Sequence, residues 1–188
     1  VINMSILPYI LINSSISLGV AAVSKICIVQ NSHLHFIFQD LGATFAKIFK
    51  KAMVYITRIE HFNAAHKLFN PNWSKEKNEE VFGKCANENW HGHNFELHVT
   101  LKGEPSTETG FVYDVKKLSV ILNEHVIEKL DHKNLNVDVD FMSGKLCSIE
   151  NLIIGIWNQL VPHLPAGVQL HSLKLYETPR IYVEYYGN

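Results

Sequence analysis

Residues 91–102 read HGHNFELHVTLK, and this stretch decides the fold. From His93 onward, apolar and polar residues alternate without interruption, which predicts a β-strand with one buried face. Because side chains two apart on a strand point to the same side, His91 and His93 present both imidazoles on one side of it. The two faces of the predicted strand carry Phe95, Leu97, Val99 and Leu101 on one side, and Glu96, His98, Thr100 and Lys102 on the other.

Three further strands are predicted around this one. Residues 54–62 read VYITRIEHF and are rich in β-branched and aromatic residues, which favour strands. Residues 168–178 and 180–186 predict two more strands, joined at Thr178 and Pro179.

Turns and loops are predicted between the strands. The polar segment 70–80 contains Pro71 and a run of charges, and it predicts a surface loop. After the central strand, residues 103–110 predict a turn and residues 111–113 a short return strand. Residues 130–141 predict an irregular polar stretch.

Two helices are predicted between the second and third strands. Asp114 and Ser148 are expected N-caps, each followed by a stripe at helical spacing that is apolar except for His125 and Lys129. The helical stripes consist of Leu118, Ile121, Leu122, His125, Val126, Lys129 and Leu130 in the first, and Leu152, Ile153, Ile156, Trp157 and Leu160 in the second. The order β-β-α-α-β-β predicts an α+β fold, with an antiparallel sheet and two helices packed on one face.

The composition of the chain changes near Met53, where the predicted domain 53–188 begins. Residues 1–24 contain no Asp, Glu, Lys or Arg. Three interpretations of residues 1–52 stay open: a segment outside the working protein, whose natural start is Met53; an appended membrane-associated or targeting segment; or an extra layer of the fold. The first is favoured, because polar residues and Pro8 interrupt the apolar stretch and no positive segment precedes it.

Charge and cysteine content exclude several classes of protein. The 188 residues carry a net charge of −1, so bulk charge does not indicate nucleic-acid binding. The three cysteines are far apart, which excludes a disulfide framework or a CxxC zinc ribbon and fits a reducing, cytoplasmic location. No glycine-rich phosphate loop is present. The 11 histidines are the outlier, and histidine is the usual metal ligand.

The histidine-rich segment predicts a metal site. His91 and His93 supply two of the three protein ligands that a catalytic zinc needs, and His66, after the first strand, is the best third candidate. The alternative is a pair of ordinary, partly exposed histidines. Cys85 could be a fourth ligand, a thiol activated as base or nucleophile, or a small buried hydrophobic residue, and spacing alone does not choose.

Acidic residues elsewhere suggest further site chemistry. Asp131 and His132 are adjacent, so the carboxylate could orient the imidazole as a general acid/base pair, although a polar turn is equally compatible. Glu177 shares a strand face with Leu173 and Leu175 and is expected to point inward, where a ligand with two N–H donors would satisfy it. Glu150 could serve only the dipole of the second helix.

Several motifs together resemble the 6-pyruvoyl-tetrahydropterin synthase family, which includes the 6-carboxy-tetrahydropterin synthases. The resemblance spans nearly all of residues 54–188. It rests on the runs FNAAH (62–66), VFGKC (81–85), HGHN (91–94), TG (109–110), LDHKNLN (130–136), EN (150–151) and YET (176–178). The resemblance implies the tunnelling fold, in which subunits join their sheets into a trimeric barrel and two trimers form a hexamer. Active sites then lie between subunits.

The resemblance also implies roles for individual residues. They are Zn²⁺ ligands at His66, His91 and His93, a catalytic thiol at Cys85, a proton-relay pair at Asp131 and His132, and pterin-binding carboxylates at Glu177 and Glu150. Lys84 and Lys133 are guesses for the triphosphate contacts. The chain departs from the family pattern at residues 147–149, which read CSI where relatives usually carry Pro-Thr or Thr-Thr before the glutamate.

The implied reaction is zinc-dependent elimination of triphosphate from 7,8-dihydroneopterin triphosphate, giving 6-pyruvoyl-tetrahydropterin for tetrahydrobiopterin biosynthesis. The alternative product is 6-carboxy-5,6,7,8-tetrahydropterin, with release of acetaldehyde, for queuosine biosynthesis. Five residues separate Cys85 from His91, which favours the pyruvoyl type. A non-catalytic zinc-stabilised module is a remote alternative, and an aldolase or cyclohydrolase on this fold is disfavoured by the full zinc–thiol set. No nucleic-acid or membrane partner is expected for the catalytic domain.

Overall fold

The computed structural model describes residues 14–18, 21–25, 27–30, 33–36 and 52–187. The chain divides into two compact units, Val1–Lys50 and Lys51–Asn188. The first unit contains two antiparallel strand pairs, which the sequence analysis did not predict: β1 (Ser14–Leu18) with β2 (Ala21–Lys25), and β3 (Cys27–Gln30) with β4 (His33–Phe36).

The interpretations of residues 1–52 concern mainly residues outside the described ranges, so they stay predictions. Within the described part of the chain, no helix has the length and apolar character that a membrane crossing requires.

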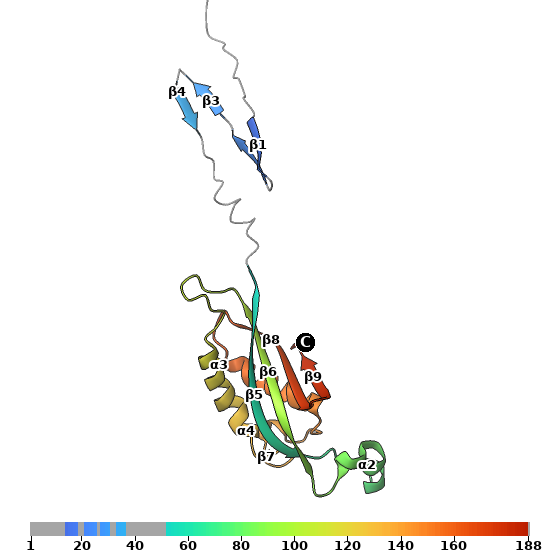
Figure 1. Ribbon diagram of the computed structural model, residues 1–188. Coiled ribbons are helices and arrows are strands. Elements are labelled where there is room, and N and C mark those ends of the chain that lie inside the picture. The colour runs from blue at the N-terminus through green and yellow to red at the C-terminus, as the bar shows by residue number, and fades with distance from the viewer. Residues whose placement is uncertain (1–13, 19–20, 26, 31–32, 37–51, 188) are drawn as a thin grey trace, which may run out of the picture. The chain divides into compact units, whose positions relative to one another are not determined.

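The second unit is built on a five-stranded sheet with the order β7-β5-β6-β8-β9 (Figure 1). Its four long strands are antiparallel, as predicted: β5 (Val54–His66), β6 (His91–Gly103), β8 (Gln169–Thr178) and β9 (Ile181–Tyr185). The fifth strand, β7 (Lys133–Asn134), runs parallel to β5 at the edge. A strand of two residues leaves no periodic pattern in the sequence. β7 was therefore not predicted, and it lies within residues 130–141, which were predicted to be irregular.

Helices cover one face of this sheet (Figure 1). The first helical segment consists of α3 (Val115–Leu122), a π-helical turn (Asn123–Ile127) and α4 (Glu128–Leu130). The second is α5 (Ile149–Leu160), followed by a 3-10 turn (Val161–His163). Both predicted caps are confirmed. The Asp114 carboxylate accepts a hydrogen bond from the Lys116 amide at 2.8 Å, and the Ser148 hydroxyl accepts one from Asn151 at 3.4 Å.

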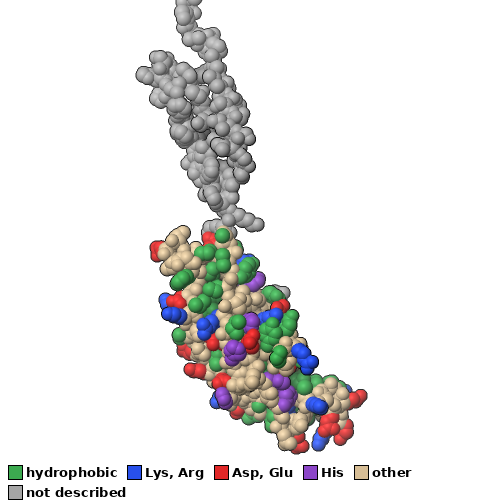
Figure 2. All heavy atoms as spheres, viewed as in Figure 1, with side chains coloured by type: hydrophobic (Ala, Val, Ile, Leu, Met, Phe, Trp, Pro, Cys, Tyr) green, Lys and Arg blue, Asp and Glu red, His purple; other side chains and the backbone are tan. Residues whose placement is uncertain are grey.

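The core lies between the sheet and these helices. The inward residues of β6 are buried, and Phe95 stacks on Phe62 of β5 with 4.9 Å between ring centroids. The opposite face of the sheet stays uncovered and carries polar and aromatic side chains such as Tyr55, His61 and Tyr182. Figure 2 shows histidine side chains among acidic and hydrophobic ones on the side of this unit turned to the viewer. The central strand therefore has the one buried face that its alternation predicted.

The segment 70–80 differs from its prediction as a loop. Its second half belongs to α2 (Lys75–Phe82), which begins after Ser74. The Ser74 side chain accepts a hydrogen bond from the Lys77 amide. Asn78 is buried, and its side chain accepts from the Asn70 amide at 2.7 Å and donates to the Asn70 carbonyl at 3.0 Å. A cap and a buried amide thus stabilise a helix that has no apolar stripe.

The predicted return strand at residues 111–113 was also wrong. They form no strand, and the bend at residues 112–113 leads directly into the Asp114 cap of α3. Three residues next to a helix start have no neighbouring strand with which to pair, so their apolar character alone did not produce a strand.

Candidate metal centre

Three imidazoles meet at one end of the sheet because of the pairing register of β5 and β6. His66 lies directly opposite His91, and His93 lies opposite Ala64. Directly opposed residues point to the same face, so all three rings lie on the helix-covered side, next to Phe95. One nitrogen from each ring lies within 4.8 Å of the other two. Across the described residues, no other group of histidine, cysteine or acidic side chains gathers in this way.

The hydrogen bonding of these rings leaves three nitrogens for a ligand. Nδ1 of His66 lies 2.7 Å from the Cys147 carbonyl oxygen, and a carbonyl can only accept, so Nδ1 donates and Nε2 keeps its lone pair. Nε2 of His66, Nδ1 of His91 and Nε2 of His93 are buried and have no hydrogen-bond partner in the described protein. Buried polar atoms without partners indicate a missing ligand, and three converging nitrogens fit a divalent metal ion.

The protonation state of the three rings also suits a metal. Burial is the largest cause and lowers the pKa of His66, His91 and His93. The neighbouring imidazoles lower these pKa values further, and the Cys147 carbonyl and Glu177 only partly oppose this for His66. The rings are therefore neutral near pH 7, which is the form that binds a metal ion. The Cys147 carbonyl fixes the tautomer of His66, as an outer-shell partner of a metal-binding histidine does.

The metal-free protein is expected to lose stability as the pH falls below 6.5, the ordinary histidine pKa. The folded-state pKa values are lowered, so between them and 6.5 the unfolded chain binds more protons, and the free energy of unfolding falls with the pH. Urea unfolding of chelator-treated protein at about pH 7.5 and about pH 5.5 measures this loss. His66→Gln has no titrating group at that position and should lose less; an equal loss in both proteins would contradict the assignment.

Glu177 lies against the same three rings. It lies near the end of β8, and its side chain is 16% exposed. Its Oε1 atom is 3.4 Å from Nε2 of His66 and 3.6 Å from Nε2 of His93. The Glu177 side chain therefore points inward, as expected from its strand face, and its carboxylate faces the three imidazoles.

Cys85 lies on a 3-10 turn, Gly83–Ala86, between α2 and β6. Its carbonyl oxygen accepts a hydrogen bond from the Leu68 amide at 2.8 Å, which ties the turn to the chain two residues after His66. The thiol is free and half-buried, and it does not belong to the group of gathered nitrogens. The arrangement therefore gives no support to Cys85 as a fourth ligand.

Asp131 and His132 form the predicted pair at the edge of β5. Nδ1 of His132 donates to the Asp131 carboxylate at 2.8 Å, and the other carboxylate oxygen accepts from the Asn63 amide at 2.7 Å. The hydrogen bond from Asn63, followed by that from His132, lowers the pKa of Asp131. The ionised carboxylate orients the ring and leaves Nε2 of His132 free to exchange protons in solvent. Asn63 anchors the pair through its backbone amide, and because it carries no catalytic group, no sequence signal marked it.

An open hollow of about 520 Å³ connects this pair with the histidine motif. His93 of the gathered rings and His132 of the pair both line it, together with Lys133. Lys84 does not line this hollow; it lies on the turn that carries Cys85. Of the two guessed phosphate contacts, only Lys133 lies beside this shared space.

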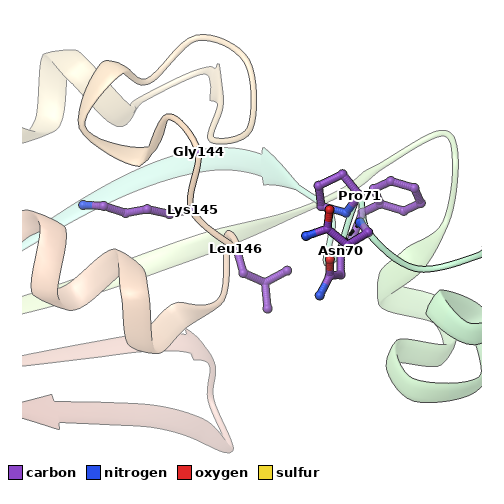
Figure 3. A pocket seen from close by; sticks show the side chains of 7 residues that line it. Asn70, Pro71, Gly144, Lys145 and Leu146 are labelled. Atoms are coloured by element: carbon purple, nitrogen blue, oxygen red, sulfur yellow. Dashed lines mark hydrogen bonds between the residues drawn. The ribbon is translucent and has the colours of Figure 1, made fainter.

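A smaller hollow of about 340 Å³ lies between the loop after β5 and the segment before α5 (Figure 3). Asn70 and Pro71 line one side, and residues 144–146 line the other. Lys145 points away from Asn70 and Pro71, and its Nζ atom donates to the Phe141 carbonyl at 3.0 Å. This hollow presents no converging titratable groups and is not a candidate site.

Residues 147–149, where the chain differs from the family pattern, lie at the start of α5. Ser148 caps the helix, and Ile149 is buried in the core where the family pattern has a hydroxyl. Glu150 lies in the first turn of α5, exposed, where its charge suits the helix dipole. The structure does not bring Glu150 to the gathered imidazoles, so its predicted role in pterin binding stays a prediction.

Fold and site together define an α+β protein in which three neutral imidazoles, suited to a divalent metal, meet a carboxylate at one end of an antiparallel sheet. The family model described as 6-pyruvoyl tetrahydropterin synthase matches residues 55–188, and the chain belongs to this family.

Similar proteins agree with this assignment. A 6-pyruvoyl tetrahydrobiopterin synthase of Dictyostelium discoideum is 41% identical over 134 residues, covering 71% of this chain and 96% of that protein. The protein of the same name from Pongo abelii is 38% identical over 138 residues, covering 73% and 94%. The solved structure of Caenorhabditis elegans 6-pyruvoyl tetrahydropterin synthase superimposes with a TM-score of 0.69 at 35% identity, covering 75% of this chain and 100% of that one.

Proposed function

We propose that this protein is a lyase that eliminates triphosphate from 7,8-dihydroneopterin triphosphate and forms 6-pyruvoyl-tetrahydropterin. The observation that carries the proposal is the convergence of three buried imidazole nitrogens, without hydrogen-bond partners, in a chain that belongs to the 6-pyruvoyl tetrahydropterin synthase family. The pairing of β5 and β6 brings the three neutral rings together in an arrangement that suits a metal ion. The reaction is proposed from the names of the similar proteins, which are 6-pyruvoyl tetrahydrobiopterin synthases.

His66, His91 and His93 would hold Zn²⁺ through these nitrogens. When bound, zinc supplies Lewis-acid polarisation of the oxygens on the substrate side chain. The three ligands come from two paired strands rather than from loops, so the protein holds them rigidly before any metal binds.

Cys85 is the proposed base that removes a proton from the substrate side chain, acting as its thiolate. His132 would carry protons to and from the neighbouring carbon and the ring, and Asp131 keeps its imidazole oriented through their hydrogen bond. Triphosphate leaves by elimination. The change of oxidation state is internal to the substrate, so the reaction needs no nucleotide cofactor.

Glu177 is the proposed acceptor for the N–H donors of the pterin ring, since its carboxylate is only 16% exposed and lies at the same centre. Glu150 is the second proposed pterin-binding acid. Lys133 is proposed to contact the triphosphate, because it lines the hollow shared by His93 and His132.

The catalytic domain is proposed to be residues 53–188, with residues 1–52 outside it, in a cytoplasmic enzyme. A hexamer made of two trimers is the proposed assembly, with active sites between subunits. The uncovered face of the sheet and its exposed edges, β7 and β9, support it, because unpaired strand edges favour association with further copies.

A product assay tests the reaction. The full chain loaded with Zn²⁺ is expected to release inorganic triphosphate from 7,8-dihydroneopterin triphosphate, together with 6-pyruvoyl-tetrahydropterin, identified by mass spectrometry. Release of acetaldehyde would instead assign the 6-carboxy-tetrahydropterin reaction. Metal binding without any turnover would favour the non-catalytic zinc-stabilised module.

A further inference from the structure

The Glu177 carboxylate lies where it could bind a metal ion directly together with the imidazoles, rather than merely nearby. Its Oε1 atom lies 3.4 Å from one of the free nitrogens, on His66, and 3.6 Å from another, on His93. Two ligands bonded to one tetrahedral zinc ion at about 2.0–2.1 Å are separated by about 3.4 Å. The carboxylate thus already has ligand spacing to two of the three imidazoles, although it lies outside the set of ligand atoms that are all within 4.8 Å of one another.

The charged groups around Glu177 also favour its role as a metal ligand. Within the described residues, its ion-pair contacts are limited to His66 and His93, and no lysine or arginine pairs with it. A carboxylate that is largely withdrawn from water needs a countercharge, and a divalent cation between it and the rings supplies one.

We propose that Glu177 is the fourth ligand of the metal in the resting protein, and that it leaves the metal when a pterin ring binds. The second half rests on the function proposed above. The same carboxylate then has two successive partners: the metal ion in the free protein, and the N–H donors of the pterin ring in the complex. With the metal bound, three imidazoles and one carboxylate would hold it and leave no position for water until the substrate arrives.

Cobalt substitution tests the resting state. The full chain loaded with Co²⁺ is expected to keep the same visible absorption spectrum between about pH 6 and about pH 9, because no metal-bound water titrates in that range. Glu177→Gln should gain a pH-dependent spectrum and bind Zn²⁺ at least about 10-fold more weakly in competition with a chelator. A pH-dependent spectrum in the unaltered chain, or identical spectra in both proteins, would overturn the proposal.

Glu96→Gln is the matched control. Glu96 also contacts two histidines, His98 at 2.6 Å and His61 at 3.2 Å, but it lies on the uncovered face of the sheet. Its replacement is expected to change neither the cobalt spectrum nor the zinc affinity. A change as large as that of Glu177→Gln would show that loss of any carboxylate–histidine pair perturbs the protein, and would remove the support for ligation.

Addition of 7,8-dihydropterin tests the exchange, because this probe has the ring but no hydroxylated side chain that could bind the metal. The cobalt spectrum of the unaltered chain is expected to become pH-dependent, like that of Glu177→Gln. Calorimetric binding of the probe without a spectral change overturns the exchange and leaves the pterin site standing. Failure of the probe to bind counts against the proposed function and the exchange, while the pH series alone still decides whether Glu177 is a resting ligand.

Discussion

Replacement of Cys85 by alanine is expected to lower kcat by about 100- to 10,000-fold and to leave the bound metal in place, since this is the usual contribution of a positioned base. The thiol lies on its own turn outside the gathered nitrogens, so its removal leaves all three imidazoles and their strand register intact. Turnover of dihydroneopterin triphosphate and metal content per chain are measured on the same preparation.

Cys147→Ala provides the control for this change. Burial raises the pKa of the Cys147 thiol to about 11, so it cannot serve as a thiolate base near neutral pH. Its contact with His66 runs through the backbone carbonyl, which alanine retains. The control variant should keep most of its turnover. If Cys85→Ala lost metal and stability together, the thiol would be a structural ligand and the catalytic assignment would be wrong.

His91→Ala is expected to weaken zinc binding by more than about 100-fold and to abolish turnover at ordinary zinc concentrations. Loss of an outer-shell partner already costs up to about 100-fold, and this change removes a ligand and leaves two imidazoles of three. His91 is only half-buried, so its truncation should leave the sheet folded. Chelator competition gives the affinity, and circular dichroism checks the fold.

The control for His91→Ala lies on the same strand. His98 faces the uncovered side of β6, where it contacts Glu96 rather than the other rings. His98→Ala should bind zinc as the unaltered chain does. Equal zinc affinity in His91→Ala and the unaltered chain would exclude the three-imidazole centre.

Much of the fold could be predicted because its signals are local. Alternation in residues 91–102 predicted β6, and caps at Asp114 and Ser148 predicted the helix starts. The failures have one local and one long-range cause. Segment 70–80 has no apolar period, and its helix depends on the buried Asn78, whose hydrogen bonds reach back to Asn70. Strand β7 consists of two residues and exists only because β5 lies beside it.

The candidate site divides in a similar way. The spacing of His91 and His93 predicts that both rings share a face, since strand side chains alternate. Adjacency in the sequence left open whether Asp131 and His132 touch, and the structure shows the contact, with Asn63 bonded to the same carboxylate. Their role as a general acid/base pair stays a prediction. The order of the motifs indicated the family resemblance, but it does not say how far apart the motifs lie in the folded protein.

The sequence by itself determined which residue types recur at strand and helix periods. It therefore determined the order of the four long strands and the two covering helical segments, and one half of the histidine centre. Only the tertiary structure decided that His66 lies opposite His91, that the Cys147 carbonyl sets the tautomer of His66, and that Glu177 faces the same nitrogens. The physical reason is the separation along the sequence of the residues that interact. Periodicity and capping depend on neighbours within a few residues, whereas these contacts join positions separated by 25 or more residues and follow from strand register and packing.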